Sequence, residues 1–147
     1  MNRSTVSLLA ALGGTVLLGG CVGNPSLAVF ATESQVKLRS YQTRVFDTTD
    51  REKMLRTVLA TLQDFGFVIE KADATLGSVS GTKLNQYEMR MTVTVRPQGE
   101  TRLLVRASAE FKPKGNAAAR PVEDAAPYRD FFAALEKSIF LAAHQVD

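Results

Sequence analysis

The stretch YEMRMTVTVRPQGETRLLVRASAEF, residues 87–111, decides the fold of this chain. Apolar and polar residues alternate on both sides of a Pro97-Gln98-Gly99 turn, which is the pattern of a β-hairpin with one buried face. The apolar residues all stand at odd positions. They are Tyr87, Met89, Met91, Val93 and Val95 before the turn, and Leu103, Val105, Ala107, Ala109 and Phe111 after it.

The turn sets which residues of the hairpin face each other. Because the core positions are odd on both strands, the loop between them needs an odd number of residues. A shift of one residue would move the apolar side chains of one strand to the opposite face of the sheet. A three-residue turn at Pro97-Gln98-Gly99 meets this condition, with Gly99 in the left-handed position. This register predicts Arg96 opposite Glu100 and Arg90 opposite Arg106.

Two amphipathic helices flank the hairpin. Thr49-Asp50-Arg51-Glu52 is a capping box that predicts a helix start, and Gly66 is the residue to end that helix. The second helix begins near Pro127, a residue tolerated in a first turn. Apolar residues recur at spacings of three and four in both helices. They are Met54, Leu55, Val58, Leu59, Leu62 and Phe65 in the first, and Tyr128, Phe131, Phe132, Leu135, Ile139, Ala142, Ala143 and Val146 in the second.

Shorter strands complete the predicted domain, at residues 39–46, 67–69 and 78–84. Both helices and the hairpin have one apolar face each, so the economical arrangement is an antiparallel sheet with two helices packed on one face. We therefore predict a single α+β domain over residues 38–147, with the element order β-α-β-β-β-β-α.

The N-terminal segment has the pattern of an export signal. Arg3 precedes an apolar stretch over residues 6–18, which is too short to cross a bilayer. Leu18-Gly19-Gly20-Cys21 resembles the lipobox of bacterial lipoproteins, which implies removal of residues 1–20 and lipidation of Cys21. Residues 21–37 show no sustained period and are expected to be a lipidated tether.

The resemblance to lipoproteins extends to sorting and to topology. Val22 and Gly23 follow the cysteine, where enteric lipoproteins retained at the inner membrane carry aspartate, so the resemblance implies an outer-membrane location. The predicted element order over residues 38–146 resembles the TATA-binding-protein-like or helix-grip class. Among bacterial lipoproteins it is similar to the BamC family, accessories of the outer-membrane β-barrel assembly machine.

Composition excludes several kinds of function. The chain has 18 Lys and Arg against 15 Asp and Glu, and without Arg3 the surplus of positive charge is only two. Such a balance is not the footprint of a nucleic-acid-binding protein. The chain has one Cys and one His, which exclude an internal disulfide and a multi-histidine metal site. We expect no cofactor and no metal.

Catalytic patterns are weak. Gly77-Ser78-Val79-Ser80-Gly81 places serine at the second and fourth positions, whereas a nucleophile elbow needs it at the third. His144 stands near the end of the last helix, where a histidine commonly interacts with the helix dipole. Glu70 and Asp73 are more simply solvated than paired for glycan hydrolysis. We therefore expect a protein that is not an enzyme.

The polar face of the hairpin carries Arg90, Arg96, Arg102 and Arg106 among serines and threonines. Two arginines directly opposite one another would repel unless an anionic group lies between them. This face is a candidate for binding an acidic protein surface, phospholipid headgroups or lipopolysaccharide phosphates. The alternative is a polar solvent face that discourages aggregation between sheets.

Taken together, these features favour a lipid-anchored accessory or scaffold protein of the outer membrane, facing the periplasm and binding protein partners in an envelope complex. A second hypothesis is a small-ligand or lipid-binding module. Its cavity would lie between the second helix and the sheet, lined by Phe131, Phe132, Leu135 and Ile139.

Overall fold

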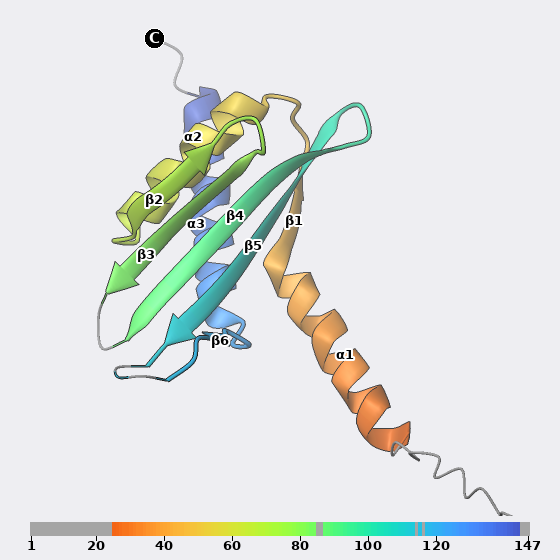
Figure 1. The fold of residues 1–147 in the computed structure, drawn as a ribbon. Helices are drawn as coiled ribbons and strands as arrows, with labels where there is room; N and C mark the ends of the chain where they lie inside the picture. Colours follow the sequence, from red (N-terminus) through yellow and green to blue (C-terminus); the bar gives the residue numbers. More distant parts are fainter. Residues whose placement is uncertain (1–24, 85–86, 114, 116, 145–147) are drawn as a thin grey trace, which may run out of the picture.

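The computed structural model describes residues 25–84, 87–113, 115 and 117–144 (Figure 1). Three helices and six strands follow one another along this part of the chain. In order they are α1 (Pro25–Gln42), β1 (Thr43–Phe46), α2 (Arg51–Asp64), β2 (Val68–Asp73), β3 (Ser78–Leu84), β4 (Glu88–Gln98), β5 (Arg102–Lys112), β6 (Arg120–Pro121) and α3 (Ala126–His144).

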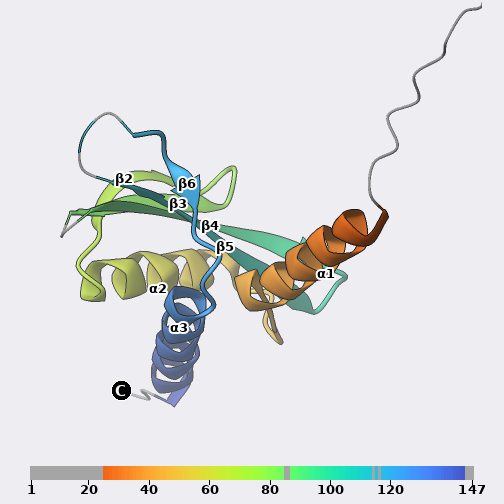
Figure 2. The same cartoon turned by 90° about the horizontal axis from the view of Figure 1, so that it is seen from below.

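The strands form one antiparallel sheet in the order β1-β5-β4-β3-β2, with β6 also pairing with β5. Helices α2 and α3 lie together on one face of this sheet (Figure 2). The prediction of an α+β fold with an antiparallel sheet and two helices packed on one face is therefore confirmed. Helix α1 and the short strand β6 are additions to the predicted element order.

The segment predicted to be a tether is helical from Pro25 onward, and the strand predicted from residue 39 begins only at Thr43, so the predicted start of that strand was wrong. The helix was not predicted because α1 has no apolar stripe, so its sequence shows no helical period. Leu38 and Tyr41, near the end of α1, pack against the core. The preceding part of α1 projects away from the sheet (Figure 1).

The hairpin turn lies two residues later than predicted. Gln98 pairs with Arg102, and Gly99, in the left-handed conformation, opens the three-residue loop. Odd positions still face odd positions, but Arg90 lies opposite Glu110 and not opposite Arg106.

Pro97 explains the difference, because it lies inside β4 instead of at the turn. Its missing N–H points to the side of β3, like the N–H of Val95, which donates to the Gly77 oxygen at 2.7 Å. Strand β3 reaches only to the Ser78–Thr94 pair, so Pro97 leaves no ladder bond unmade.

The core lies between the helices and the inward face of β4 and β5. The N-cap of helix α2 is Asp50, one residue after the predicted Thr49, and the Asp50 Oδ1 atom accepts from the Lys53 N–H at 2.8 Å. Gly66 has φ 79° and ends this helix as predicted. The largest fully buried side chains include Tyr128, Phe131, Phe132, Met54, Leu62, Leu103 and Leu135.

A buried tyrosine closes the exposed edge of β5. Strand β1 pairs with β5 over Leu103 to Arg106, and β6 pairs with it at Glu110 and Phe111, which leaves a gap between them. In this gap the Tyr128 hydroxyl accepts from the Ala109 N–H and from the Gln42 Nε2, both at 3.2 Å. It donates to the Val122 oxygen at 2.7 Å. Tyr128 is 0% exposed, so one hydroxyl satisfies three buried polar groups.

We expect Tyr128→Phe to lower the free energy of unfolding by about 1–3 kcal/mol, because it leaves buried partners of the hydroxyl unsatisfied. Urea denaturation measures this loss. Tyr87→Phe is the matched control, since Tyr87 is exposed, and its effect should stay within about 0.5 kcal/mol. Equal effects of the two substitutions would contradict the role assigned to Tyr128.

Candidate functional site

The inward apolar row of β4 extends beyond the helices that cover it. Val95 is 0% exposed and Met91 2%, but Met89 is only partly buried and Tyr87 is 42% exposed. The row is continuous in sequence and in the sheet, since Met89 pairs with Phe111 of β5. The end of the sheet near the β3–β4 connection therefore presents apolar side chains of core type to the surface.

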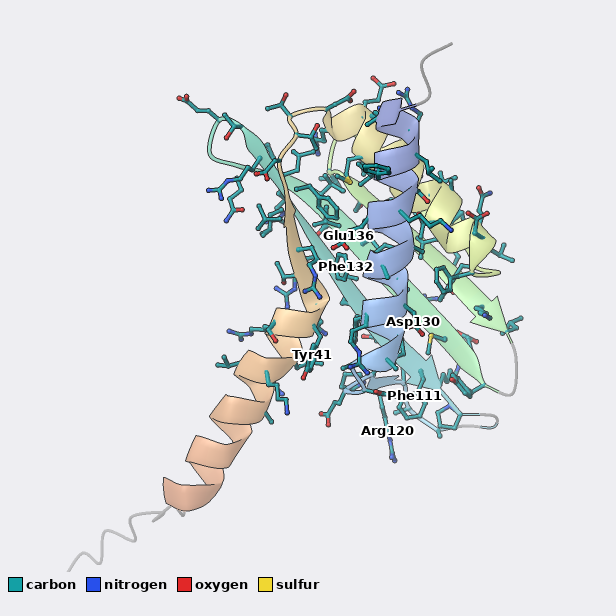
Figure 3. All side chains as sticks on the ribbon, turned by 180° about the vertical axis from the view of Figure 1, so that it is seen from behind. Tyr41, Phe111, Arg120, Asp130, Phe132 and Glu136 are labelled. Carbon is teal, nitrogen blue, oxygen red and sulfur yellow. The ribbon has the colours of Figure 1, made fainter. Side chains whose placement is uncertain are left out.

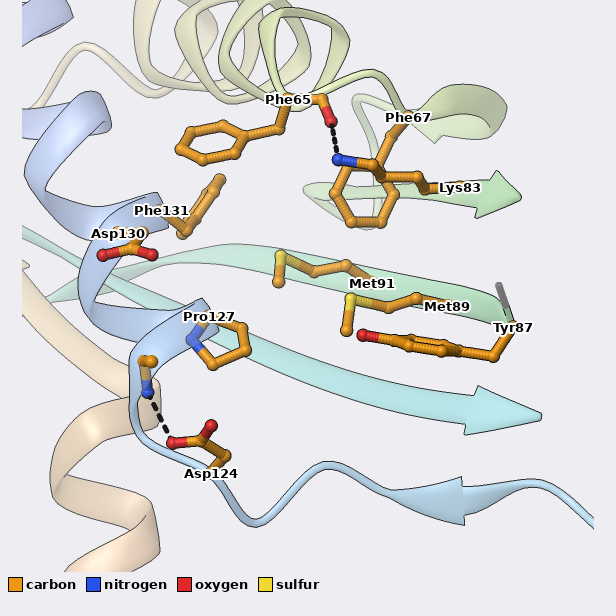
Figure 4. Close-up of a pocket in the computed structure, with 11 residues that line it drawn as sticks. Phe65, Phe67, Lys83, Tyr87, Met89, Met91, Asp124, Pro127, Asp130 and Phe131 are labelled. Carbon is orange, nitrogen blue, oxygen red and sulfur yellow. Dashed lines mark hydrogen bonds between the residues drawn. The ribbon is translucent and has the colours of Figure 1, made fainter. Parts of the chain in front are cut away.

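Two adjoining hollows lie over this end of the sheet, and we call them together the sheet-end groove. The inner hollow has a volume of about 290 Å³ and the outer one about 550 Å³. Both are lined by Tyr87, Met89, Asp124 and Pro127. Figure 4 shows the inner hollow, where the methionines of β4 face aromatic side chains that come from α3 and from the end of α2. Its apolar lining includes Phe65, Phe67, Met91 and Phe131.

The outer wall of the groove is aromatic. The Tyr87 and Phe111 rings lie edge to face, with 6.1 Å between their centroids and an interplanar angle of 75°. Phe111 stands at the end of β5 beside β6, at the end of the molecule from which α1 projects (Figure 3). The groove and the N-terminal helix thus lie at one end of the domain.

The rim of the groove carries acidic side chains. Asp124 and Asp130 line the inner hollow, and Glu123 lines the outer one. The Asp124 Oδ1 accepts from the Ala126 N–H at 3.0 Å, which caps the start of α3. Lys83 also lines the inner hollow, and its Nζ donates to the Phe65 oxygen at 2.7 Å (Figure 4). These acidic residues were not singled out from the sequence, because no pattern in the segment before α3 or in the first part of α3 indicates that they meet at one hollow.

The cavity predicted between the last helix and the sheet is filled. Phe132 and Leu135 are buried in the core, and the guanidinium of Arg44 lies over the Phe132 ring at 5.3 Å from its centroid. The Arg44 Nε also lies 3.9 Å from the Glu136 Oε1, and Phe132 and Glu136 lie on the same helix, α3 (Figure 3). Of the four residues predicted to line a ligand cavity, Phe131 lines the inner hollow of the sheet-end groove.

The predicted repulsion between Arg90 and Arg106 does not exist, because the register places them apart. Arg90 lies opposite Glu110, and its Nε is 3.1 Å from the Glu70 Oε2. The pKa of the Glu70 carboxyl lies below its ordinary value, first because of the neighbouring Thr82 hydroxyl and then because of the Arg90 charge. Arg90 is thus held by a carboxylate of this same domain.

The other three arginines predicted to form a binding face are exposed on the sheet face opposite the helices. Arg96, Arg102 and Arg106 form no ion pair within the residues that the structure describes. Arg96 and Arg106 border a hollow of about 340 Å³ together with Thr94, Leu104 and Ser108. All four arginines therefore lie on one polar face of the sheet, where Arg90 is paired with Glu70 and the other three form no ion pair in the described part of the chain.

Several of the residues considered for catalysis have backbone or turn contacts in the described part of the chain. Gly77 has φ 67°, and a Cβ on it would stand 2.5 Å from the Val95 oxygen. A glycine is therefore needed here for the backbone conformation and for the close approach to β4. Ser80 lies opposite Thr92 within the sheet. The Asp73 Oδ1 accepts from the Leu76 N–H at 2.8 Å in the turn after β2. The side chain of His144 and the whole of residues 1–24, Cys21 included, lie outside the described part of the chain.

Across the described ranges, no three His, Cys, Asp or Glu side chains gather closely enough to hold a metal ion. None of the helices placed by the structure combines the length and the apolar character that a bilayer crossing demands. No protein-family model matches this chain, and none of the curated proteins is significantly similar to it.

We expect Arg90→Gln to raise the pKa of Glu70 toward its ordinary value, measured by NMR titration of the carboxyl at low salt. Because the folded pKa is depressed, the stabilisation from Glu70 exists above the unfolded-state pKa and is lost as the pH falls through the folded value. Arg106 forms no ion pair in the described part of the chain, so Arg106→Gln is the control and should leave the pKa of Glu70 unchanged. A Glu70 pKa insensitive to Arg90→Gln would refute the pairing.

Proposed function

We propose that this protein is a non-enzymatic accessory lipoprotein of the outer membrane. It faces the periplasm and binds a protein partner of an envelope assembly through the sheet-end groove. The observation that carries the proposal is the uncovered end of the inward row, where Tyr87 and Met89 continue the core out to the surface. An exposed apolar surface of this kind, rimmed by polar residues, is typical of interaction sites.

The composition of the groove favours a protein partner. Tyrosine, phenylalanine and methionine are enriched at the centres of protein interfaces, and the flexible methionine side chain adapts to different partners. Met89 and Met91 lie side by side along β4 in Figure 4, facing the inner hollow. A groove with this lining accepts apolar side chains from a chain that lies across its opening.

The N-terminal segment supplies the anchor in this proposal. The lipobox resemblance makes Cys21 the lipidated residue, and two or more acyl chains give stable anchoring at about 0.8 kcal/mol per buried CH₂. Helix α1 has 18 residues and spans about 27 Å. Because α1 projects at the groove end of the domain, it acts as a spacer between the lipid leaflet and the groove (Figure 1). The resemblance to the BamC family is consistent with such a setting.

A second candidate function is the binding of a small apolar ligand or lipid. The observation that favours it is the inner hollow, whose volume of about 290 Å³ lies near the lower end for small-molecule pockets. The core beneath α3 is packed, so any such ligand would bind at the sheet-end groove and compete with the partner. The experiments below separate the two candidates.

We expect Cys21→Ser to abolish acylation and to leave the signal segment uncleaved, because the thiol is the atom that takes the diacylglyceryl group. Mass spectrometry of the purified protein and membrane fractionation measure the two effects, and globomycin should block cleavage in the unaltered chain. A bare thiol on the processed protein would contradict the lipoprotein assignment.

We expect a photo-crosslinking amino acid at position 87 to yield a discrete protein adduct in intact cells. The matched control is the same amino acid at position 76, because Leu76 is also exposed but lies in the β2–β3 connection, at the opposite end of β3 from the groove. An adduct at 87 alone supports partner binding. Adducts to phospholipid only, equal adducts at both positions, or none at 87 would contradict it.

A further inference from the structure

We infer that the sheet-end groove recognises a cationic apolar segment, in which a bulky apolar side chain stands beside Lys or Arg. This inference rests on the proposed function and names the chemistry of the partner. It follows from two properties of one surface, the apolar floor and the sign of the charge around it.

The floor accepts apolar side chains only. Met89, Met91 and Phe131 line the inner hollow together with the phenylalanines at the end of α2. Met91 and Phe131 are buried, while Met89 is half-buried, so the hollow deepens toward the core. A polar group pushed into it would lose its water without gaining a partner.

The rim is negative. Asp124 and Asp130 border the inner hollow and are exposed, and Glu123 borders the outer hollow. None of the three forms an ion pair within the described residues. Asp124 uses one oxygen to cap α3, which leaves its second oxygen for a ligand.

Two of the cationic side chains near the groove are engaged or turned away from it. Lys83 is the cation that lines the inner hollow, and its ammonium donates to the Phe65 oxygen on the far wall (Figure 4). Arg120 on β6 projects away from the body of the domain in Figure 3 and lines neither hollow. An anionic amphiphile would therefore meet like charge at the rim, whereas a lysine or arginine would meet unpaired carboxylates.

Binding of matched synthetic peptides to the detergent-solubilised lipoprotein tests this inference. The probe is a fluorescent 14-residue amphipathic peptide of leucine and lysine, and its counterparts carry glutamate in place of lysine or serine in place of leucine. Fluorescence anisotropy should show binding of the leucine–lysine peptide alone, weakened by added salt. Equal binding of the glutamate or serine peptide would overturn the inference.

Two sets of variants locate the site. Asp124→Asn with Asp130→Asn should weaken binding of the leucine–lysine peptide about tenfold. Asparagine also caps helices, so α3 keeps its start. Glu100→Gln removes a carboxylate at the distant hairpin tip and should change affinity less than twofold. Tyr87→Ala should weaken binding because it removes part of the outer wall of the groove. Equal effects of the Asp124/Asp130 and Glu100 changes would overturn the inference.

The crosslinking experiment separates failure of this inference from failure of the proposed function. A protein adduct at position 87 that persists unchanged in the Asp124→Asn/Asp130→Asn variant would refute cationic recognition while leaving partner binding in place. Loss of that adduct in this variant, but not in Glu100→Gln, is the expected result.

Discussion

The position of α3 on the sheet governs the rest of the structure, and the Tyr128 hydroxyl fixes it. Three hydrogen bonds from one buried oxygen connect the start of α3 to β5, to the end of α1 and to the chain that follows β6. With α3 held there, the inward row of β4 is covered as far as Met91 and only partly covered from Met89 outward. The interaction that closes one edge of the sheet thus also determines how much apolar surface stays open at its end.

The two faces of the sheet have different chemistry. The helix-covered face ends in an apolar groove with a negative rim, and the opposite face carries hydroxyls and three unpaired arginines. Charged and hydroxyl side chains on an open sheet face discourage pairing between sheets, which is sufficient reason for their presence. Resistance to aggregation does not explain the groove, because aromatic and methionine side chains at a surface lose favourable burial unless a partner covers them.

Local patterns in the sequence predicted most of the fold. The alternation of apolar and polar residues over 87–111 identifies the sheet. Apolar residues at spacings of three and four identify α2 and α3, and each of these patterns has one apolar face that must be buried. The odd parity of the hairpin was also predictable. The turn position was not, because Pro97 is tolerated inside β4 only where β3 has ended, and that depends on strand lengths. Helix α1 has no apolar stripe and gave no signal.

The candidate site was less predictable than the fold. Tyr87, Met89 and Phe111 belong to the predicted core row, and nothing in the alternation indicates that this end of the row is uncovered. That property arises from where α3 crosses the sheet. The acidic rim comes from Glu123 and Asp124 just before α3 and from Asp130 within α3, and these side chains gather at the groove only in three dimensions. The arginine pairing failed with the register, since a shift of two residues exchanges one opposite partner for another.

The most direct measurement of the central claim is the oxidation of Met89 by dilute peroxide, followed residue by residue with mass spectrometry, in intact envelopes and in the purified lipoprotein. A partner in the groove should protect Met89 in the envelope and expose it after purification, while buried Met54 stays unreactive in both. Equal oxidation of Met89 in the two preparations would contradict the account.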